Sequence, residues 1–205
     1  MRNRAGWILG LAATVLAYRL LVRDWHLTWG ATAEEAAGPL PGDDLVADPD
    51  IQSTRAIAID APPSAVWPWL VQTGSGRGGA YTYDWIENLL GLNMHSADRV
   101  VPEWQELEVG DVLFGSKDGP VMKAEIVDRE RVLAWRSEDG KWVWSFVLSP
   151  DGDRTRLISR NRIALDGSLG GKLGMAVMEP GSWVMERKML LGIKERAERL
   201  AREPD

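Results

Sequence analysis

The stretch that decides the fold is 182-SWVMERKMLLGIKERAERLAR-202. Its apolar residues recur at steps of four, four, four and three, at Met185, Met189, Ile193, Ala197 and Leu200. This is the spacing of one helical face, and the charged residues fall mostly on the other side. Pro180 and Ser182 suit a helix start, because a proline loses little in the first turn and a serine oxygen accepts from an unpaired backbone N–H. The stretch therefore predicts a long helix whose apolar face needs a partner.

The predicted partner is a run of strands in the middle of the chain. The strand-like segments are Asp111–Ser116, Val121–Asp128, Arg131–Ser137, Lys141–Ser149 and Arg154–Leu165. Asp-Gly pairs in the connections are hairpin signals, so these segments form an antiparallel meander. An earlier strand is expected over Ser53–Asp60, followed by short helices over Ser64–Gln72 and Asp84–Leu90, the second with Asp84 and Glu87 as a capping box. The order predicts an α+β helix-grip fold, a curved antiparallel sheet of about six strands around the C-terminal helix.

Alternation along the strands predicts which side chains face the core. Trp142, Trp144, Phe146 and Leu148 share one face, as do Leu133 and Trp135. In the last strand Ser159 and Asn161 share a face with leucine and isoleucine, whereas its arginines lie on the opposite face, which we expect to be wet. A buried Ser159 or Asn161 needs a partner: backbone, water or a ligand.

Composition narrows the function classes. A net charge of -6 and a pI near 5.1 argue against nucleic-acid binding, which calls for clustered lysine and arginine. The chain has no cysteine, which excludes disulfides and thiolate chemistry, and its two histidines, His26 and His95, are too far apart for an ordinary zinc site. We therefore expect no metal. Eleven tryptophans beside two phenylalanines suit a large core or an apolar pocket.

The first 22 residues form a hydrophobic segment. Arg2 and Arg4 precede the apolar run Ala5–Ala17, which favours a membrane anchor over residues 1–22, because Arg19 and Arg23 follow where a cleavable signal usually turns neutral. A cleaved signal peptide and a soluble amphipathic helix are the alternatives. The early arginines favour a domain outside the cytoplasm, whereas the later ones oppose it. Residues 23–50 are interpreted as a linker or surface arm, and residues 51–203 as the domain.

Two loops raise the question of a cofactor or of catalysis. Residues 74–79 match the pattern G-x-G-x-x-G, but a predicted helix precedes them, so a flexible loop is favoured over a dinucleotide site and no cofactor is expected. His95 with Asp98 or Asp84 has the composition of an acid/base pair. A surface loop with local turn hydrogen bonds explains the same residues.

At this point the chain resembles a known family. The segments GRGGAYTYDWIENLLG, HSADR, PEWQ and MERKMLLGIKERAE are similar to uncharacterised bacterial members of the SRPBCC superfamily, which includes START-type lipid-transfer domains and polyketide cyclases. The resemblance covers Ile51–Arg202 and implies a cavity between the sheet and the C-terminal helix. Its implied lining is Trp135, Trp144, Phe146, Asn161, Met185 and Met189, with Tyr83 and His95 near the mouth.

The leading function hypothesis is membrane-tethered binding or transfer of a small hydrophobic molecule such as a lipid, an isoprenoid or a polyketide. The alternative is a cyclase- or hydrolase-type enzyme with His95 as general base, oriented by Asp98 or Asp84. A third hypothesis is a structural domain whose core is filled by its own tryptophans. The direction in which His95 points distinguishes the first two hypotheses.

Overall fold

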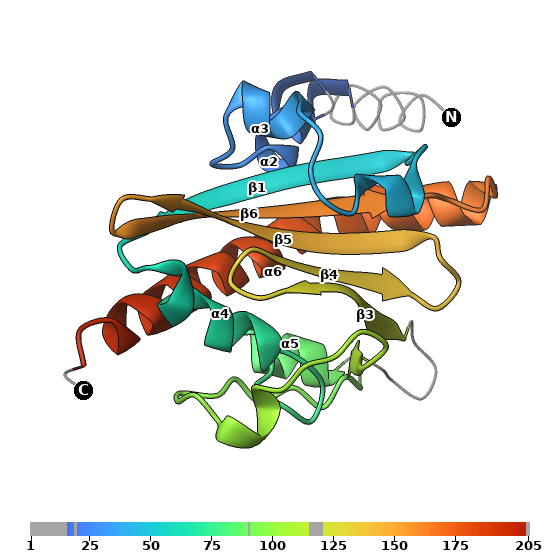
Figure 1. The fold of residues 1–205 in the computed structure, drawn as a ribbon. Helices are drawn as coiled ribbons and strands as arrows, with labels where there is room; N and C mark the ends of the chain where they lie inside the picture. The colour runs from blue at the N-terminus through green and yellow to red at the C-terminus, as the bar shows by residue number, and fades with distance from the viewer. Residues whose placement is uncertain (1–15, 19, 90, 115–120, 204–205) are drawn as a thin grey trace, which may run out of the picture.

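A computed structural model of the protein describes residues 16–18, 20–89, 91–114 and 121–203. In it a six-stranded antiparallel sheet curves around one long helix (Figure 1). The strand order is β1-β6-β5-β4-β3-β2. The bounds are β1 Ile51–Ile59, β2 Val112–Phe114, β3 Met122–Asp128, β4 Val132–Ser137, β5 Trp142–Asp151 and β6 Arg154–Ile163. The predicted α+β helix-grip fold is confirmed.

Strand register sets the inner face of the sheet. Trp144 of β5 lies opposite both Trp135 of β4 and Asn161 of β6, and Ser159 of β6 lies opposite Arg55 of β1. Because side chains alternate along each strand, these residues all point to the side covered by the long helix α6. The predicted alternation therefore holds across the sheet, and it places polar groups among the aromatic ones.

Helix α6 spans Leu169–Leu200 and passes behind the strands in Figure 1. It begins 13 residues before the predicted start at Ser182, and the Ser168 hydroxyl caps it by accepting from the Gly171 N–H (2.9 Å). Pro180 lies inside the helix. The predicted start at Ser182 is therefore wrong. Pro180 removes one backbone hydrogen bond from the helix, but the neighbouring Glu179 is bound by Arg23 of the N-terminal arm, and these contacts stabilise the helix at this point.

Two short helices follow β1 as predicted. Helix α4 (Pro63–Val71) buries Trp67, Trp69 and Leu70 against the core, and α5 spans Asp84–Leu89. The predicted capping role of Asp84 is wrong: its carboxylate accepts from the Ser96 N–H (2.8 Å) and from the Ser96 hydroxyl (2.6 Å). A short 3-10 helix, η2 (Pro102–Trp104), completes this side of the molecule.

The N-terminal arm, residues 23–50, covers the outer face of the sheet over β1, β6 and part of β5. The arm contains α2 (Arg23–Leu27), α3 (Ala33–Ala37) and the 3-10 helix η1 (Asp43–Val46). Arg160 of β6 is 1% exposed and donates to the carbonyl oxygens of residues 35, 36 and 38 and to the Asp43 carboxylate (2.7 Å). Arg156 and Arg162 bind the arm in the same way. The expectation of a wet arginine face is therefore wrong, because the arm covers most of it.

The predicted anchor, residues 1–22, lies mostly outside the described residues. Residues 16–18 and 20–21 are helical and lead into α2. Within the part of the chain that the structure describes, no helix combines the length and the apolar character needed to cross a bilayer.

Candidate functional site

A buried carboxylate, Glu186, organises a polar cluster between α6 and the sheet. One Glu186 oxygen accepts from the Ser159 hydroxyl (2.7 Å), and the other accepts from the Asn161 amide (3.1 Å). The two residues of β6 thus find their partner in the protein itself. Trp144 and Trp142 complete the cluster, since their indole N–H groups donate to Ser159 Oγ and Asn161 Oδ1 (both 2.8 Å).

Arg55 of β1 supplies the positive charge of this cluster. Its side chain is fully buried; it forms an ion pair with Glu186 and donates from Nε to the carbonyl oxygen of His26 (3.0 Å). Arg55 Nη2 has no hydrogen-bond partner among the described residues. Burial raises the pKa of Glu186, while Arg55, Ser159 and Asn161 oppose that rise. Removal of one charge would strand the other in the interior, so the pair acts as a unit.

A second buried carboxylate, Glu179, lies seven residues earlier on α6 and joins it to the N-terminal segment. Arg23 donates to both of its oxygens (2.9 and 2.8 Å), and the Tyr18 hydroxyl donates to one of them (3.2 Å). His26 is 2% exposed, contacts the Tyr18 hydroxyl and lies 3.7 Å from Glu179. Burial lowers the pKa of His26, so the neutral imidazole is favoured there.

An open hollow, which we call the end hollow, lies between the first turns of α6 and the ends of β5 and β6. Its volume is about 450 Å³. The apolar part of its wall consists of Trp142, Ile163, Ala164, Leu165, Met175 and Met178. Lys141, Asp139 and Asp166 stand among its polar residues. Trp142 belongs to both the hollow and the Glu186 cluster. A molecule in the hollow would therefore touch an indole ring whose N–H group is already hydrogen-bonded to Asn161.

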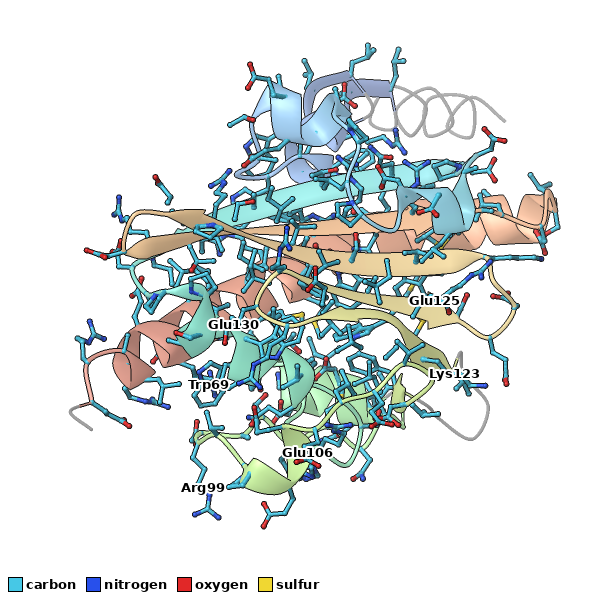
Figure 2. The ribbon with its side chains drawn as sticks, viewed as in Figure 1. Trp69, Arg99, Glu106, Lys123, Glu125 and Glu130 are labelled. Atoms are coloured by element: carbon cyan, nitrogen blue, oxygen red, sulfur yellow. The ribbon has the colours of Figure 1, made fainter. Side chains whose placement is uncertain are left out.

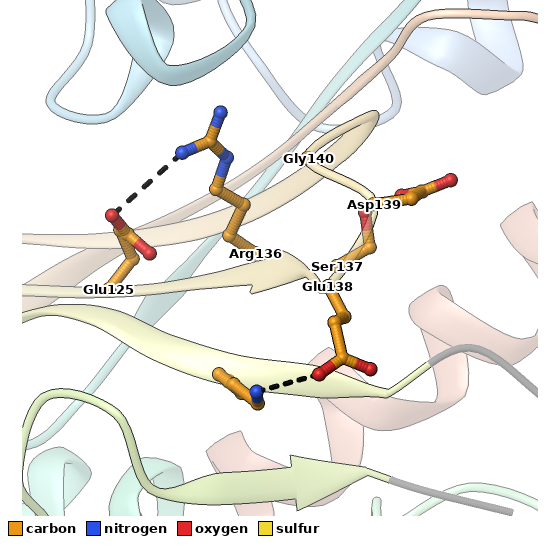
Figure 3. Close-up of a pocket in the computed structure, with 7 residues that line it drawn as sticks. Glu125, Arg136, Ser137, Glu138, Asp139 and Gly140 are labelled. Carbon is orange, nitrogen blue, oxygen red and sulfur yellow. Dashed lines mark hydrogen bonds and ion pairs between the residues drawn. The ribbon is translucent and has the colours of Figure 1, made fainter.

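Another hollow, of about 390 Å³, lies on the outer face of β3 and β4 (Figure 3). Its wall carries charged side chains, including Lys123 and Glu125, which project from β3 (Figure 2). Lys123 pairs with Glu138 (2.9 Å), and Arg136 approaches Glu125 (3.9 Å). Most of the charged groups of this hollow thus lie close to an opposite charge, and Asp139 accepts from the Ser137 hydroxyl (2.6 Å).

The structure places the predicted lining residues in two environments. Trp135, Phe146 and Met189 are fully buried, and the ring centroids of Trp135 lie 5.1 Å from Phe146 and 5.2 Å from Trp144. These rings pack edge to face or tilted, a favourable arrangement that fills the space beneath the middle of α6. Asn161 belongs to the Glu186 cluster, and Met185 is half-buried on α6. Ligand contact by these residues remains a prediction.

The predicted acid/base residues are not brought together. His95 is exposed and has no hydrogen bond or ion pair with Asp84 or Asp98. Asp84 binds Ser96, whereas Asp98 is paired with Arg196 of α6 (3.0 Å). Tyr83 is also exposed, just before α5. The loop is thus held next to His95, by Ser96 bound to Asp84 of α5 and by Asp98 bound to Arg196, and His95 itself is exposed. Within the described residues no group of His, Asp and Glu side chains is arranged to hold a metal ion.

Sequence reasoning missed Arg55, Glu179 and Glu186. A signal for Arg55 was present: it shares strand parity with Ile57 and Ile59, so an arginine stands on an apolar face. The seven-residue spacing of Glu179 and Glu186 places both carboxylates on one side of a helix. Their partners come from β1, β6 and the arm, far away in the sequence, and the helix pattern alone does not reveal them.

Comparisons with known proteins show only distant similarity. No family model matches the chain, and no curated protein matches it. Solved structures with some similarity include the KanY protein (13% identity, TM-score 0.48, covering 72% of this chain and 97% of that chain). The Aha1 dimer from Colwellia psychrerythraea shares 17% identity at a TM-score of 0.44, covering 72% and 96%. CalU16 from Micromonospora echinospora shares 20% identity at a TM-score of 0.34, covering 73% and 85%. Similarity at this level carries no argument about what this chain binds.

Proposed function

We propose that the protein binds a small apolar molecule in the end hollow. The observation that carries the proposal is the composition of the hollow: Met175 and Met178 of α6 line one open space together with Trp142 of β5 and Ile163 of β6. Removing hydrocarbon from water contributes about 25 cal/mol per Å² of buried area. Methionine side chains adapt to irregular apolar shapes, so the site suits a class of molecules rather than one rigid ligand.

The Glu186 cluster supports this proposal by fixing one wall. The hydrogen bond from Trp142 to Asn161, and that from Asn161 to Glu186, hold the Trp142 ring in one orientation. A preformed wall lowers the ordering cost of binding. The polar rim at Lys141 and Asp139 suits a ligand with one polar end. Lipids, isoprenoids and polyketide-like molecules have this form, and the sequence resemblance to the SRPBCC superfamily favours the same ligand classes.

We further propose that residues 1–22 tether the domain to a membrane, so that the ligand is exchanged with the lipid phase. The support is the apolar run Ala5–Ala17, bounded by arginines on both sides. In a test, the substitutions Ile8→Arg and Leu11→Arg in the full chain move the protein from the membrane fraction to the soluble fraction. A full chain without substitutions that is already found in the soluble fraction would disprove the tether.

The binding test is titration of the full chain with an apolar dye whose fluorescence rises in a dry environment. We expect Met178→Arg to weaken dye binding about tenfold or more, because it places a charge in the apolar wall. The matched control is Val109→Arg, a substitution at another exposed apolar residue, which does not line the hollow. Circular dichroism checks that each variant is folded.

A second variant approaches the same site without adding a charge. A Cβ atom added at Gly174 meets no atom within 4 Å, and Gly174 lines the hollow, so we expect the side chain of Gly174→Leu to occupy space that a ligand would take. Loss of dye binding in both hollow variants, with retention in the control, supports the proposal. Dye binding that is absent from the unaltered protein, or unchanged in both variants, would disprove it.

A further inference from the structure

The first half of α6 exposes an apolar stripe to solvent. Leu169 is 73% exposed, Leu173 61% and Val184 43%. Their spacings of four and eleven residues correspond to about one and three helical turns, so the three side chains lie on one face of the helix. Met178 is nine residues after Leu169, about two and a half turns, and projects from the opposite side into the end hollow. The stripe is therefore separate from the proposed binding site.

The N-terminal segment, which contacts α6, also exposes apolar side chains. Leu20 and Leu21 are 71% and 77% exposed, and Trp25 is 54% exposed. The Trp25 ring packs against Trp183 of α6, with 5.1 Å between ring centroids. The ion pair between Arg23 and Glu179 joins the same two segments. The patch formed by Leu20, Leu21, Trp25, Leu169, Leu173 and Val184 thus belongs to one fixed unit.

We propose that this patch lies on the surface of a lipid bilayer. The apolar run Ala5–Ala17 enters the described structure directly at this patch, which makes a bilayer the apolar phase nearest to it. Trp25 has the amphipathic ring that favours a membrane interface. Asp24 and Asp166 border the patch, so apolar insertion rather than attraction to anionic lipid provides the affinity.

This inference rests on the proposed membrane tether. It adds to the tether a specific orientation of the domain relative to the bilayer. The stripe and the end hollow lie on opposite sides of the same helix, so the first turns of α6 lie between the bilayer and the bound molecule. Gly170, Gly171, Gly174 and Pro180 occur in this part of the helix, where each lowers helix stability. A ligand that enters from the membrane would pass around or beneath these turns.

The test uses the absence of cysteine from the chain, which allows one label at a chosen position. Leu173→Cys in the full chain is labelled with an environment-sensitive fluorophore and mixed with phosphatidylcholine vesicles that carry a quencher in the acyl chains. We expect a blue shift of the emission and strong quenching. The control is Leu89→Cys, which is 80% exposed on α5, away from the patch, and should show neither effect.

Each outcome decides the inference separately from ligand binding in the end hollow, and the fractionation of the full chain decides the tether by itself. Unchanged emission at position 173 overturns the docking surface, and so does equal quenching at positions 173 and 89, which would indicate unspecific adsorption. A blue shift without vesicles that grows with protein concentration would indicate a second copy on the patch and also overturns it. Dye binding in the end hollow is measured without vesicles, so it can stand when docking fails, and docking can stand when dye binding fails.

Discussion

The two halves of α6 are held in different ways. In the C-terminal half Met189, Leu190 and Ile193 are fully buried, and Gly192 approaches residue 81 so closely that an added Cβ would lie 2.7 Å from the Tyr81 carbonyl oxygen. In the first half Leu169 and Leu173 are mostly exposed, and an added Cβ at Gly174 would meet open space. One continuous helix therefore combines a core element with a surface element.

This difference indicates where movement is least costly. The C-terminal half cannot shift without opening the aromatic core, whereas the first half is held mainly by polar contacts of Glu179 with Tyr18 and Arg23. Regions with few buried apolar contacts open locally at low free energy, and binding sites are commonly found there. The end hollow lies against that half.

The largest expected effect concerns the two buried carboxylates. Glu186→Ala leaves Arg55 buried without its counter-ion, and we expect a loss of about 3–5 kcal/mol in the free energy of unfolding. Glu179→Ala is the matched change in the first half of α6. It should lower the free energy of unfolding by less, because its partner Arg23 is partly exposed and can be solvated. Urea denaturation measures both variants. Equal losses would contradict the contrast between the halves.

Alanine at Gly192 tests the close packing of the C-terminal half. The added methyl group collides with backbone and Cβ atoms of Tyr81, so we expect Gly192→Ala to destabilise the protein by about 1–3 kcal/mol despite the higher helix propensity of alanine. The midpoint of thermal unfolding reports the change. A variant as stable as the parent would show that α6 can move away from residue 81 at little cost.

Acidification should weaken the contact that holds the first half. The pKa of His26 is lowered in the folded protein, so its contribution to stability is present above its unfolded pKa of about 6.5 and is lost as the pH falls below that value. We expect the free energy of unfolding to fall between pH 7 and pH 5, and we expect His26→Gln to reduce this fall. His95→Gln, at the exposed histidine, is the control. The comparison uses urea unfolding at both pH values. If the stability of the parent and of His26→Gln falls equally, this role of His26 is wrong.

The smallest effect has the opposite sign. Gly174→Ala adds helix propensity where nothing obstructs the methyl group, so it should stabilise the protein by about 0.5–1 kcal/mol. The same substitution thus raises stability in one half of α6 and lowers it at Gly192 in the other. Destabilisation at both glycines would show that the first half is packed as tightly as the second.

Local patterns predicted the architecture well and the polar site poorly. Strand alternation assigned Trp144, Ser159 and Asn161 to the inner face, because that assignment depends only on neighbouring residues. The start of α6 was misplaced because Pro180 is locally typical of a first helical turn, whereas in the structure it lies inside the helix. Glu186 and Arg55 are 131 residues apart, and nothing in the periodicity of either segment specifies that they meet.

The arginines of β6 have a mechanical consequence. From Arg23 to Asp50 the chain is fastened to the sheet at several points, including the carbonyl oxygens of residues 30, 35, 36, 38, 46 and 47. A connector of this length that was not bound to the sheet would act as a flexible linker and let the domain move freely. Because the arm is bound along its length, a force applied at the N-terminus would act directly on β6, the strand next to the edge strand β1. The domain would therefore keep a fixed orientation relative to whatever holds that end.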